Sequence, residues 1–251
     1  MVAIIDNEDN LWVSGSNKYG QLGLGHNNPI NQIINTHIKV ISVSCGKCHT
    51  AIIDQNNCLW VTGDNSYGQL GLGNILNINY FINTNIKVIS VSCGDYHTAI
   101  IDQNSNLWTT GYNIYGQLGL RHADNICRFT KTNVKAISVS CGRHHTAIIG
   151  INNCLWITGS NHCGQLGAGN IKEIHQFINT NIEITSVTCN TYRTIITDKD
   201  NYLWVTGEND YGELGLGGNI NEVSQFTKIE NFIPKTPSNR FKKTKSARKI
   251  D

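Results

Sequence analysis

The chain has 251 residues, 39% of them apolar and 15% charged, with a formal net charge of +2. This composition is typical of a globular protein and excludes a disordered one. No run of about 18 apolar residues is present to cross a membrane, and the first residues, MVAIIDNEDN, lack the basic start and long apolar core of a secretory signal. We therefore expect an intracellular protein of the cytoplasm or nucleus that does not associate with membranes.

One pattern, LWVTGDNSYGQLGLG at residues 59–73, recurs five times along the chain. A constant period of this size predicts a modular array rather than an irregular domain. The tryptophan of the pattern marks each copy, and successive copies are 48 residues apart: Trp12, Trp60, Trp108, Trp156 and Trp204.

Each copy contains short segments whose side chains alternate with a period of two, which predicts β-strands. In the best-defined copy these are Val40–Cys45, His49–Asp54 and Cys58–Gly63, separated by turn residues, and an outer edge strand is expected over Tyr80–Lys87. The repeat is therefore predicted to be a four-stranded antiparallel sheet.

A small sheet that is apolar on both faces cannot bury itself alone, and radial stacking of such sheets gives a β-propeller. Solenoid repeats are shorter, and helical repeats require an apolar period of about 3.6 residues that is absent here. We expect Trp60 and Leu70 to pack between neighbouring sheets. Gly63 and Gly68 are expected to mark a turn with positive φ, and Gly71 and Gly73 to let the backbone pass close to the next blade.

The nine cysteines do not predict a disulfide or metal framework. Cys45 and Cys48 form a C-x-x-C pair, but no second pair lies at a zinc-site spacing and the other copies replace Cys48 by Tyr or His. We predict small buried thiols, and neither a metal nor a cofactor. One cysteine recurs in each of four copies: Cys45, Cys93, Cys141 and Cys189.

Two motifs recur in a fixed order and together resemble the repeat of the regulator of chromosome condensation family. Gly-Gln-Leu-Gly occurs at 20–23, 68–71, 116–119 and 164–167, and Gly-Glu-Leu-Gly at 212–215. Cys-Gly-x-x-His-Thr occurs at 45–50, 93–98 and 141–146 and becomes Cys-Asn-Thr-Tyr-Arg-Thr at 189–194. The resemblance covers residues 2 to about 226 and implies a β-propeller.

Closure of a propeller ring requires strands from the two ends of the repeat array to form one complete blade. The chain begins at VAIID, inside a second strand, so the first blade is expected to lack its first strand. Phe226–Phe232 could fill that place, but no Cys-Gly-x-x-His follows it, and Pro234 and Pro237 would interrupt a strand ladder. We predict an all-β propeller domain over residues 1–234, with five 48-residue repeats, that is five-bladed or incompletely closed.

The sequence predicts no catalytic residues. His49, His97 and His145 recur with the repeat, so we interpret them as structural histidines that form hydrogen bonds within each blade. No Ser/His/Asp or Cys/His set can be assembled without these repeat residues, and no phosphate-binding loop of the G-x-x-x-x-G-K-[ST] type is present. We therefore expect a protein that is not an enzyme.

Positions that vary within a constant repeat are candidates for recognition, because they face solvent. The two residues before each recurring histidine vary in this way, and their aromatic and charged side chains are typical of protein interfaces. We predict a monomeric protein-interaction module that binds a protein partner here; solvated turns without a partner are the alternative. The candidate partner-binding residues are Lys47, Cys48, Asp95, Tyr96, Arg143 and His144.

The resemblance also implies a second function, guanine-nucleotide exchange on a small GTPase. Exchange factors of the family grip the GTPase with residues in these turns, which assigns that role to Asp95 and His144. They also insert a wedge between strands of one blade, whereas the constant spacing of the tryptophans leaves no such insertion here. This difference argues against exchange.

Residues 235–251 differ in character from the repeats and predict a flexible basic tail. They hold seven of the 20 basic residues and a single acidic residue, Asp251. A solvated tail, a nuclear-import-like signal and an arm that binds DNA or chromatin phosphates are three alternatives. The basic tail of the family usually precedes the propeller, whereas this one follows it. The candidate tail residues are Arg240, Lys242, Lys243, Lys245, Arg248 and Lys249.

Overall fold

The computed structural model describes residues 1–217 and 220–230. The predicted basic tail at 235–251 lies outside the described residues, as do Phe232, Pro234 and Pro237. In the described part of the chain every regular element is a β-strand, which confirms the all-β class. No helix long and apolar enough to cross a membrane occurs among these residues.

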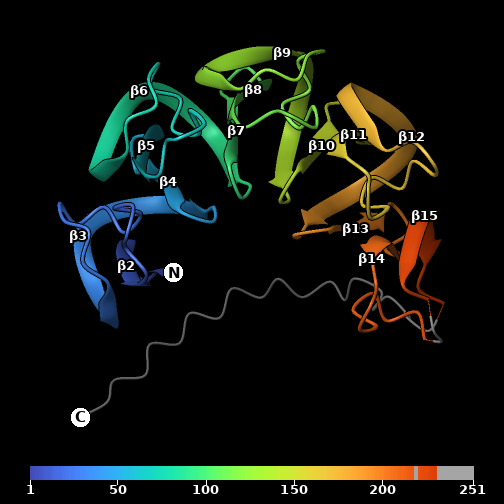
Figure 1. Cartoon of the computed structure of the whole chain (residues 1–251), viewed down its shortest axis with the longest axis horizontal. Helices are drawn as coiled ribbons and strands as arrows, with labels where there is room; N and C mark the ends of the chain where they lie inside the picture. The colour runs from blue at the N-terminus through green and yellow to red at the C-terminus, as the bar shows by residue number, and fades with distance from the viewer. Residues whose placement is uncertain (218–219, 231–251) are drawn as a thin grey trace, which may run out of the picture.

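Within residues 1–217 and 220–230, fifteen strands follow one another in sequence order, and each is paired antiparallel with its neighbours. Figure 1 shows that they are arranged along an arc, with β1–β3 at one end and β13–β15 at the other. The short strands are β1 (Val2–Ile5), β2 (Asn10–Gly15), β4 (His49–Asp54), β5 (Cys58–Gly63), β7 (His97–Asp102), β8 (Asn106–Gly111), β10 (His145–Gly150), β11 (Cys154–Ser160), β13 (Arg193–Asp198), β14 (Leu203–Glu208) and β15 (Glu222–Lys228). The long strands are β3 (Ile30–Cys45), β6 (Ile78–Cys93), β9 (Ile126–Cys141) and β12 (Glu173–Cys189).

The long strands correct one detail of the prediction. The expected edge strand Tyr80–Lys87 does not stop at Lys87 but continues into the first strand of the next repeat as β6. The first half of β6 pairs with β5, from Gly63↔Ile78 to Cys58↔Lys87, and its second half pairs with β7. One strand therefore belongs to two neighbouring sheets, and each internal sheet has the four antiparallel strands that were predicted.

We call each of these sheets a sheet segment. The first contains β1, β2 and the first half of β3, and each of the following four contains the second half of one long strand, two short strands and the next outer strand. The last segment is made of the second half of β12 with β13, β14 and β15.

The core lies between neighbouring segments, as expected for sheets that cannot bury themselves alone. Ala51 and Leu70 are fully buried and share one apolar cluster with Ile100 of the next segment. Trp60 packs against a second cluster that holds residues of the preceding segment. The predicted positions of Trp60 and Leu70 between sheets are therefore confirmed.

Glycine is required where the loops of one segment pass over the outer strand of the next. Gly71 has a φ of 70°, in the left-handed region that favours glycine. A Cβ at this position would overlap the ring of Phe129, which lies in the next outer strand, β9. The turn can therefore lie against the neighbouring sheet only because it lacks a side chain.

The ends of the array are not paired with each other in the described residues. There β1 pairs only with β2, and β15 pairs only with β14. The predicted closing segment is described as far as Glu230, and its residues Phe226–Lys228 lie in β15, which forms the outer strand of the last segment. It therefore does not occupy the first-strand position of the first segment, because pairing with β14 already uses it.

Candidate interaction site on the turn face

Two kinds of connection lie on one face of the arc: the turn that follows each long strand, and the loop that precedes the next outer strand. Because His49 pairs with Gly63 in the β4–β5 ladder, the turn before β4 and the loop after β5 lie at the same end of the sheet. The same holds for the later repeats. We call this end the turn face; it comprises the turns 46–48, 94–96, 142–144 and 190–192 and the loops 16–29, 64–77, 112–125, 161–172 and 209–217.

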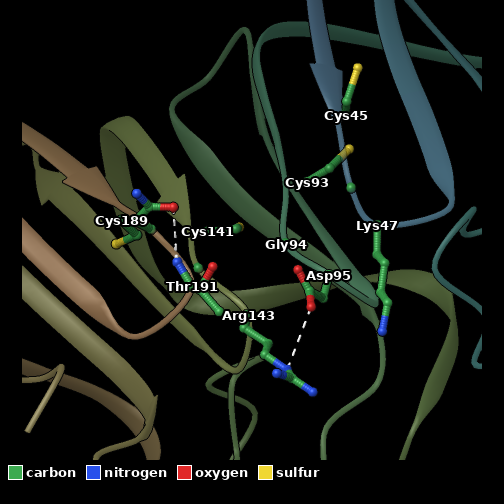
Figure 2. A pocket seen from close by; sticks show the side chains of 12 residues that line it. Cys45, Lys47, Cys93, Gly94, Asp95, Cys141, Arg143, Cys189 and Thr191 are labelled. Carbon is green, nitrogen blue, oxygen red and sulfur yellow. Dashed lines mark hydrogen bonds and ion pairs between the residues drawn. The ribbon is translucent and has the colours of Figure 1, made fainter. Parts of the chain in front are cut away.

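The structure places three of the predicted residues around one pocket of about 300 Å³. Lys47, Asp95 and Arg143 line it together with the repeating cysteines and the residues that follow them (Figure 2). Thr191 provides the corresponding position of the last segment. The pocket therefore lies where the first turns of four successive segments converge.

The predicted residues contact one another between neighbouring segments. Lys47 donates from Nζ to the Tyr96 hydroxyl at 2.7 Å, and its ammonium lies 5.1 Å from the centre of that ring. Arg143 makes the equivalent contact with Tyr192. Arg143 Nε also lies 3.5 Å from the Asp95 carboxylate. These side chains therefore form a row across the turn face rather than isolated positions.

Burial and neighbouring charges shift the pKa values of the side chains in and beside this row. Burial raises the pKa of Asp95, and the positive charges of Arg143 and Lys47 oppose that rise without cancelling it. The hydrogen bond to Tyr96 raises the pKa of Lys47. His144 is half-buried, and its pKa falls to about 4 because of burial and the nearby charges of Arg143 and Lys47. Near neutral pH the row therefore presents two cations and one carboxylate, and the neutral imidazole of His144 lies beside it.

A cluster of six aromatic side chains lies beside this row, and only two of its members were predicted. Tyr67 lies 5.5 Å from Tyr96 and 4.8 Å from Tyr112, measured between ring centres. Tyr115 lies 4.9 Å from His144. Most of these pairs have the edge-to-face geometry that aromatic rings favour. The aromatic cluster consists of Tyr67, Tyr96, Tyr112, Tyr115, His144 and His162.

The missed members had a signal of their own in the sequence. Tyr67 and Tyr115 precede the Gly-Gln-Leu-Gly turns, at a position that is tyrosine in four of the five copies and Cys163 in the fourth, so the signal was a recurring aromatic residue. Tyr112 directly follows the strand β8, where another copy has Asp64.

Cys48, the remaining predicted residue, is half-buried and does not line the pocket. Burial raises the pKa of its thiol.

The recurring histidines are structural, but they link segments rather than act within one. His49 Nε2 lies 2.9 Å from Thr98 Oγ1 of the next segment, and His97 contacts Thr146 at the same distance. The expectation of hydrogen bonds within each blade is therefore wrong for these side-chain bonds, because the ring points toward the neighbouring sheet. Burial lowers the pKa of His97 to about 3, so the ring is neutral.

Three of the four recurring cysteines, Cys93, Cys141 and Cys189, serve the same junctions between segments, whereas Cys45 is exposed. The Cys93 amide donates to Ser44 Oγ of the preceding segment at 2.9 Å, and its thiol contacts the Ser44 carbonyl. Burial raises the pKa of Cys93 to about 12, which keeps the thiol protonated. All nine cysteines are free, and the described residues contain no group of three or more His, Cys, Asp or Glu side chains arranged to hold a metal ion.

The fold and this site define a repeat protein of the propeller type, built from sheet segments whose turns converge on one face. Two models of the regulator of chromosome condensation (RCC1) repeat match the chain. One matches residues 8–53, 56–101 and 104–149, and the other matches 40–69, 88–117 and 136–165. The matches cover more than half of the chain, so the protein belongs to the RCC1 repeat family.

Solved structures agree with this assignment at the level of the fold. Human WBSCR16 superimposes with a TM-score of 0.77 at 20% identity, covering 88% of this chain and 61% of that chain. Yeast RCC1 (Prp20) bound to Kap60 gives 0.78 at 16% identity, with 89% and 57% covered. Prp20p from Saccharomyces cerevisiae, studied for its binding properties to Gsp1p and histones, gives 0.76 at 16%, with 88% and 59% covered.

The chain thus spans about three-fifths of the length of these structures. None of the curated proteins matches the sequence.

Proposed function

We propose that this protein is a non-enzymatic interaction module that binds a protein partner on the turn face. The observation that carries the proposal is the aromatic cluster beside the row of Lys47, Asp95 and Arg143. Aromatic and arginine side chains are enriched at the centres of protein interfaces, where they supply large contact areas at low entropic cost. Tyr67 is 38% exposed, so a partner can reach the ring that contacts Tyr96 and Tyr112.

The arrangement of the array is part of the proposal. We infer five blades in an incompletely closed arc, acting as a monomer inside the cell, in the cytoplasm or the nucleus. The relatives support a protein partner: the titles of the yeast structures describe RCC1 (Prp20) bound to Kap60, and binding of Prp20p to Gsp1p and histones. Affinity capture followed by mass spectrometry would identify the partner of this chain.

Affinity capture with paired variants tests the proposal. The immobilised protein is incubated with an extract of the host cell, and bound proteins are identified by mass spectrometry. We expect a specific protein to be retained by the parent and by Asn56→Ala or Gln103→Ala, whose exposed side chains lie in the hairpins at the opposite end of the sheets. The double variant Tyr67→Ala/Tyr96→Ala loses it. Equal retention by all variants rejects the turn face as the binding surface.

Exchange on a small GTPase is the second candidate, and the position on the turn face of both residues named by the resemblance supports it. Asp95 lines the pocket and His144 belongs to the aromatic cluster. Release of a fluorescent nucleotide from a panel of purified GTPases tests this function. Stimulation by the parent that is lost in Asp95→Ala and in His144→Ala supports exchange, and no stimulation of any GTPase rejects it.

Binding of DNA or chromatin by residues 235–251 remains a prediction, since these residues are outside the described part of the chain. Deleting them tests it. Retention on DNA that weakens with salt and disappears after the deletion supports a phosphate-binding arm. Retention that is unchanged by the deletion rejects it.

A further inference from the structure

The junction between neighbouring segments is built in the same way three times. Gly46, Gly94 and Gly142 occupy equivalent positions, and a Cβ at each would overlap a backbone carbonyl oxygen of the next segment. The same Cβ would overlap the ring of the histidine that contacts threonine in that next segment. Glycine and histidine are therefore required together wherever a further segment is packed.

The last segment replaces both of these residues. Asn190 occupies the glycine position and Arg193 the histidine position, while the local turn is kept by the same backbone hydrogen bond, from the Asn190 amide to the Arg193 carbonyl. In the internal junctions a side chain at the first of these positions would collide with a following segment. A residue with a Cβ therefore fits here only when no segment of this type is stacked on the sheet.

Arg193 also satisfies its own charge within the last segment. Its guanidinium donates to the Glu208 carbonyl at 2.8 Å, to the Glu208 carboxylate at 3.2 Å and to the Glu213 carboxylate. In the other copies the position of Glu213 is a glutamine, namely Gln21, Gln69, Gln117 and Gln165. Arginine and its carboxylate partner are thus introduced together, and they replace the histidine–threonine contact between segments.

The apolar residue that faces the next segment is also different in the last segment. Ala51, Ala99 and Ala147 are fully buried against the following segment. The equivalent residue of the last segment is Ile195, which is larger and 36% exposed. An isoleucine in the space of a fully buried alanine would overpack the junction.

We propose that the last segment is a cap that ends the stacking of repeats. The bulk of Ile195 disfavours packing of the first segment of the same chain, or of a second copy, on this outward face, so the array remains an open monomeric arc. The first segment has a matching change: Val2 stands at the position of the acceptors Thr98 and Thr146, so it offers no hydroxyl to a histidine packed against it.

Thiol labelling of the full chain tests whether this face is free. Ile195→Cys and Ala147→Cys are compared by maleimide labelling and mass-spectrometric mapping, with the native cysteines as internal references. We expect Cys at 195 to react at least about a hundredfold faster, since position 147 becomes accessible only when the protein opens locally. Equal protection at the two positions would mean that the face is covered and would overturn the proposal.

A second, independent test introduces the residues of the last segment into an internal segment, and the internal residues into the last segment. Gly94→Asn/His97→Arg/Ala99→Ile is expected to lower the urea midpoint strongly or to prevent folding, whereas Asn190→Gly/Ile195→Ala changes it little. Sedimentation over a hundredfold range of concentration should give a monomer for the parent. The proposal is wrong if the internal exchange is tolerated, or if the parent forms oligomers that Ile195→Asp dissociates.

Discussion

Lys47 and Tyr96 are 49 positions apart in the chain, and their side chains meet at 2.7 Å across the junction of two segments. Each is a variable residue of its own repeat, so their contact arises from stacking and not from the repeat itself. The Lys47 side chain is exposed, and its contact with Tyr96 combines a hydrogen bond with a cation–π interaction.

Removing this contact is expected to affect binding far more than folding. Lys47→Met and Tyr96→Phe should each change the free energy of unfolding by less than about 1 kcal/mol, because exposed charged contacts contribute little to stability. The same variants should weaken retention of the captured partner. Urea unfolding followed by tryptophan fluorescence measures the first effect, and affinity capture measures the second. A large loss of stability in both variants would identify the contact as part of the scaffold instead.

The buried histidines predict a loss of stability in mild acid. Burial lowers the pKa of His49 to about 4 and that of His97 and His145 to about 3, while an unfolded histidine titrates near 6.5. Between these values the unfolded chain binds protons that the folded chain does not, so stability falls as pH decreases below about 6.5. Each histidine contributes a slope of about 1.4 kcal/mol per pH unit in that window.

Urea midpoints at pH 7.5, 6 and 5 measure this slope. His97→Gln serves as the matched variant, because it keeps a polar side chain beside Thr146 and removes one titrating group. Its slope should be smaller than that of the parent by one proton. An unchanged slope would show that His97 is not the source of the acid sensitivity.

Local pattern was sufficient to predict the short strands. The predicted segments His49–Asp54 and Cys58–Gly63 coincide with β4 and β5, since alternation of side chains and turn residues both act within a few positions. The junction at Lys87 was harder to predict. No glycine or proline separates Tyr80–Lys87 from Val88–Cys93, and the strand runs through both as β6.

Contacts between repeats could not be predicted from one repeat, because they depend on how the sheets are stacked. The bond from His49 to Thr98 and the approach of Tyr67 to Tyr112 both join residues of successive copies. A repeat pattern shows that these positions recur, but it does not show which of them face each other. The family resemblance predicts the class of fold, whereas the row of charges and the aromatic cluster depend on the three-dimensional stacking of the segments.

The turns over the neighbouring sheet predict a contrast between two glycines. Gly71→Ala should cost about 3 kcal/mol or more, because alanine is strained at a φ of 70° and its Cβ overlaps the Phe129 ring. Gly25→Ala should cost only about 1 kcal/mol, since Gly25 has a φ of 79° but no atom within 4 Å of the added Cβ. Urea unfolding of both variants gives the comparison, and equal costs would show that backbone strain alone explains them.

The tryptophans of the repeat predict a second contrast, between a copy that has a carboxylate partner and one that lacks it. Trp108 Nε1 donates to the Asp102 carboxylate at 2.9 Å, whereas the aspartate position is Gly150 in the copy that contains Trp156. Burial alone would raise the pKa of Asp102, but hydrogen bonds from Asn106 and Trp108 lower it to about 2, so the carboxylate is ionised at neutral pH.

Trp108→Phe should therefore cost about 1.5 kcal/mol more than Trp156→Phe at pH 7, the lower end of the usual net contribution of a hydrogen bond to a charged group. Both substitutions remove a similar apolar area, so the difference isolates the bond. It should shrink as the pH falls from about 4 toward 2, because Asp102 gains a proton there and accepts the bond less strongly. Equal costs for the two tryptophans at pH 7 would show that the indole contributes only packing.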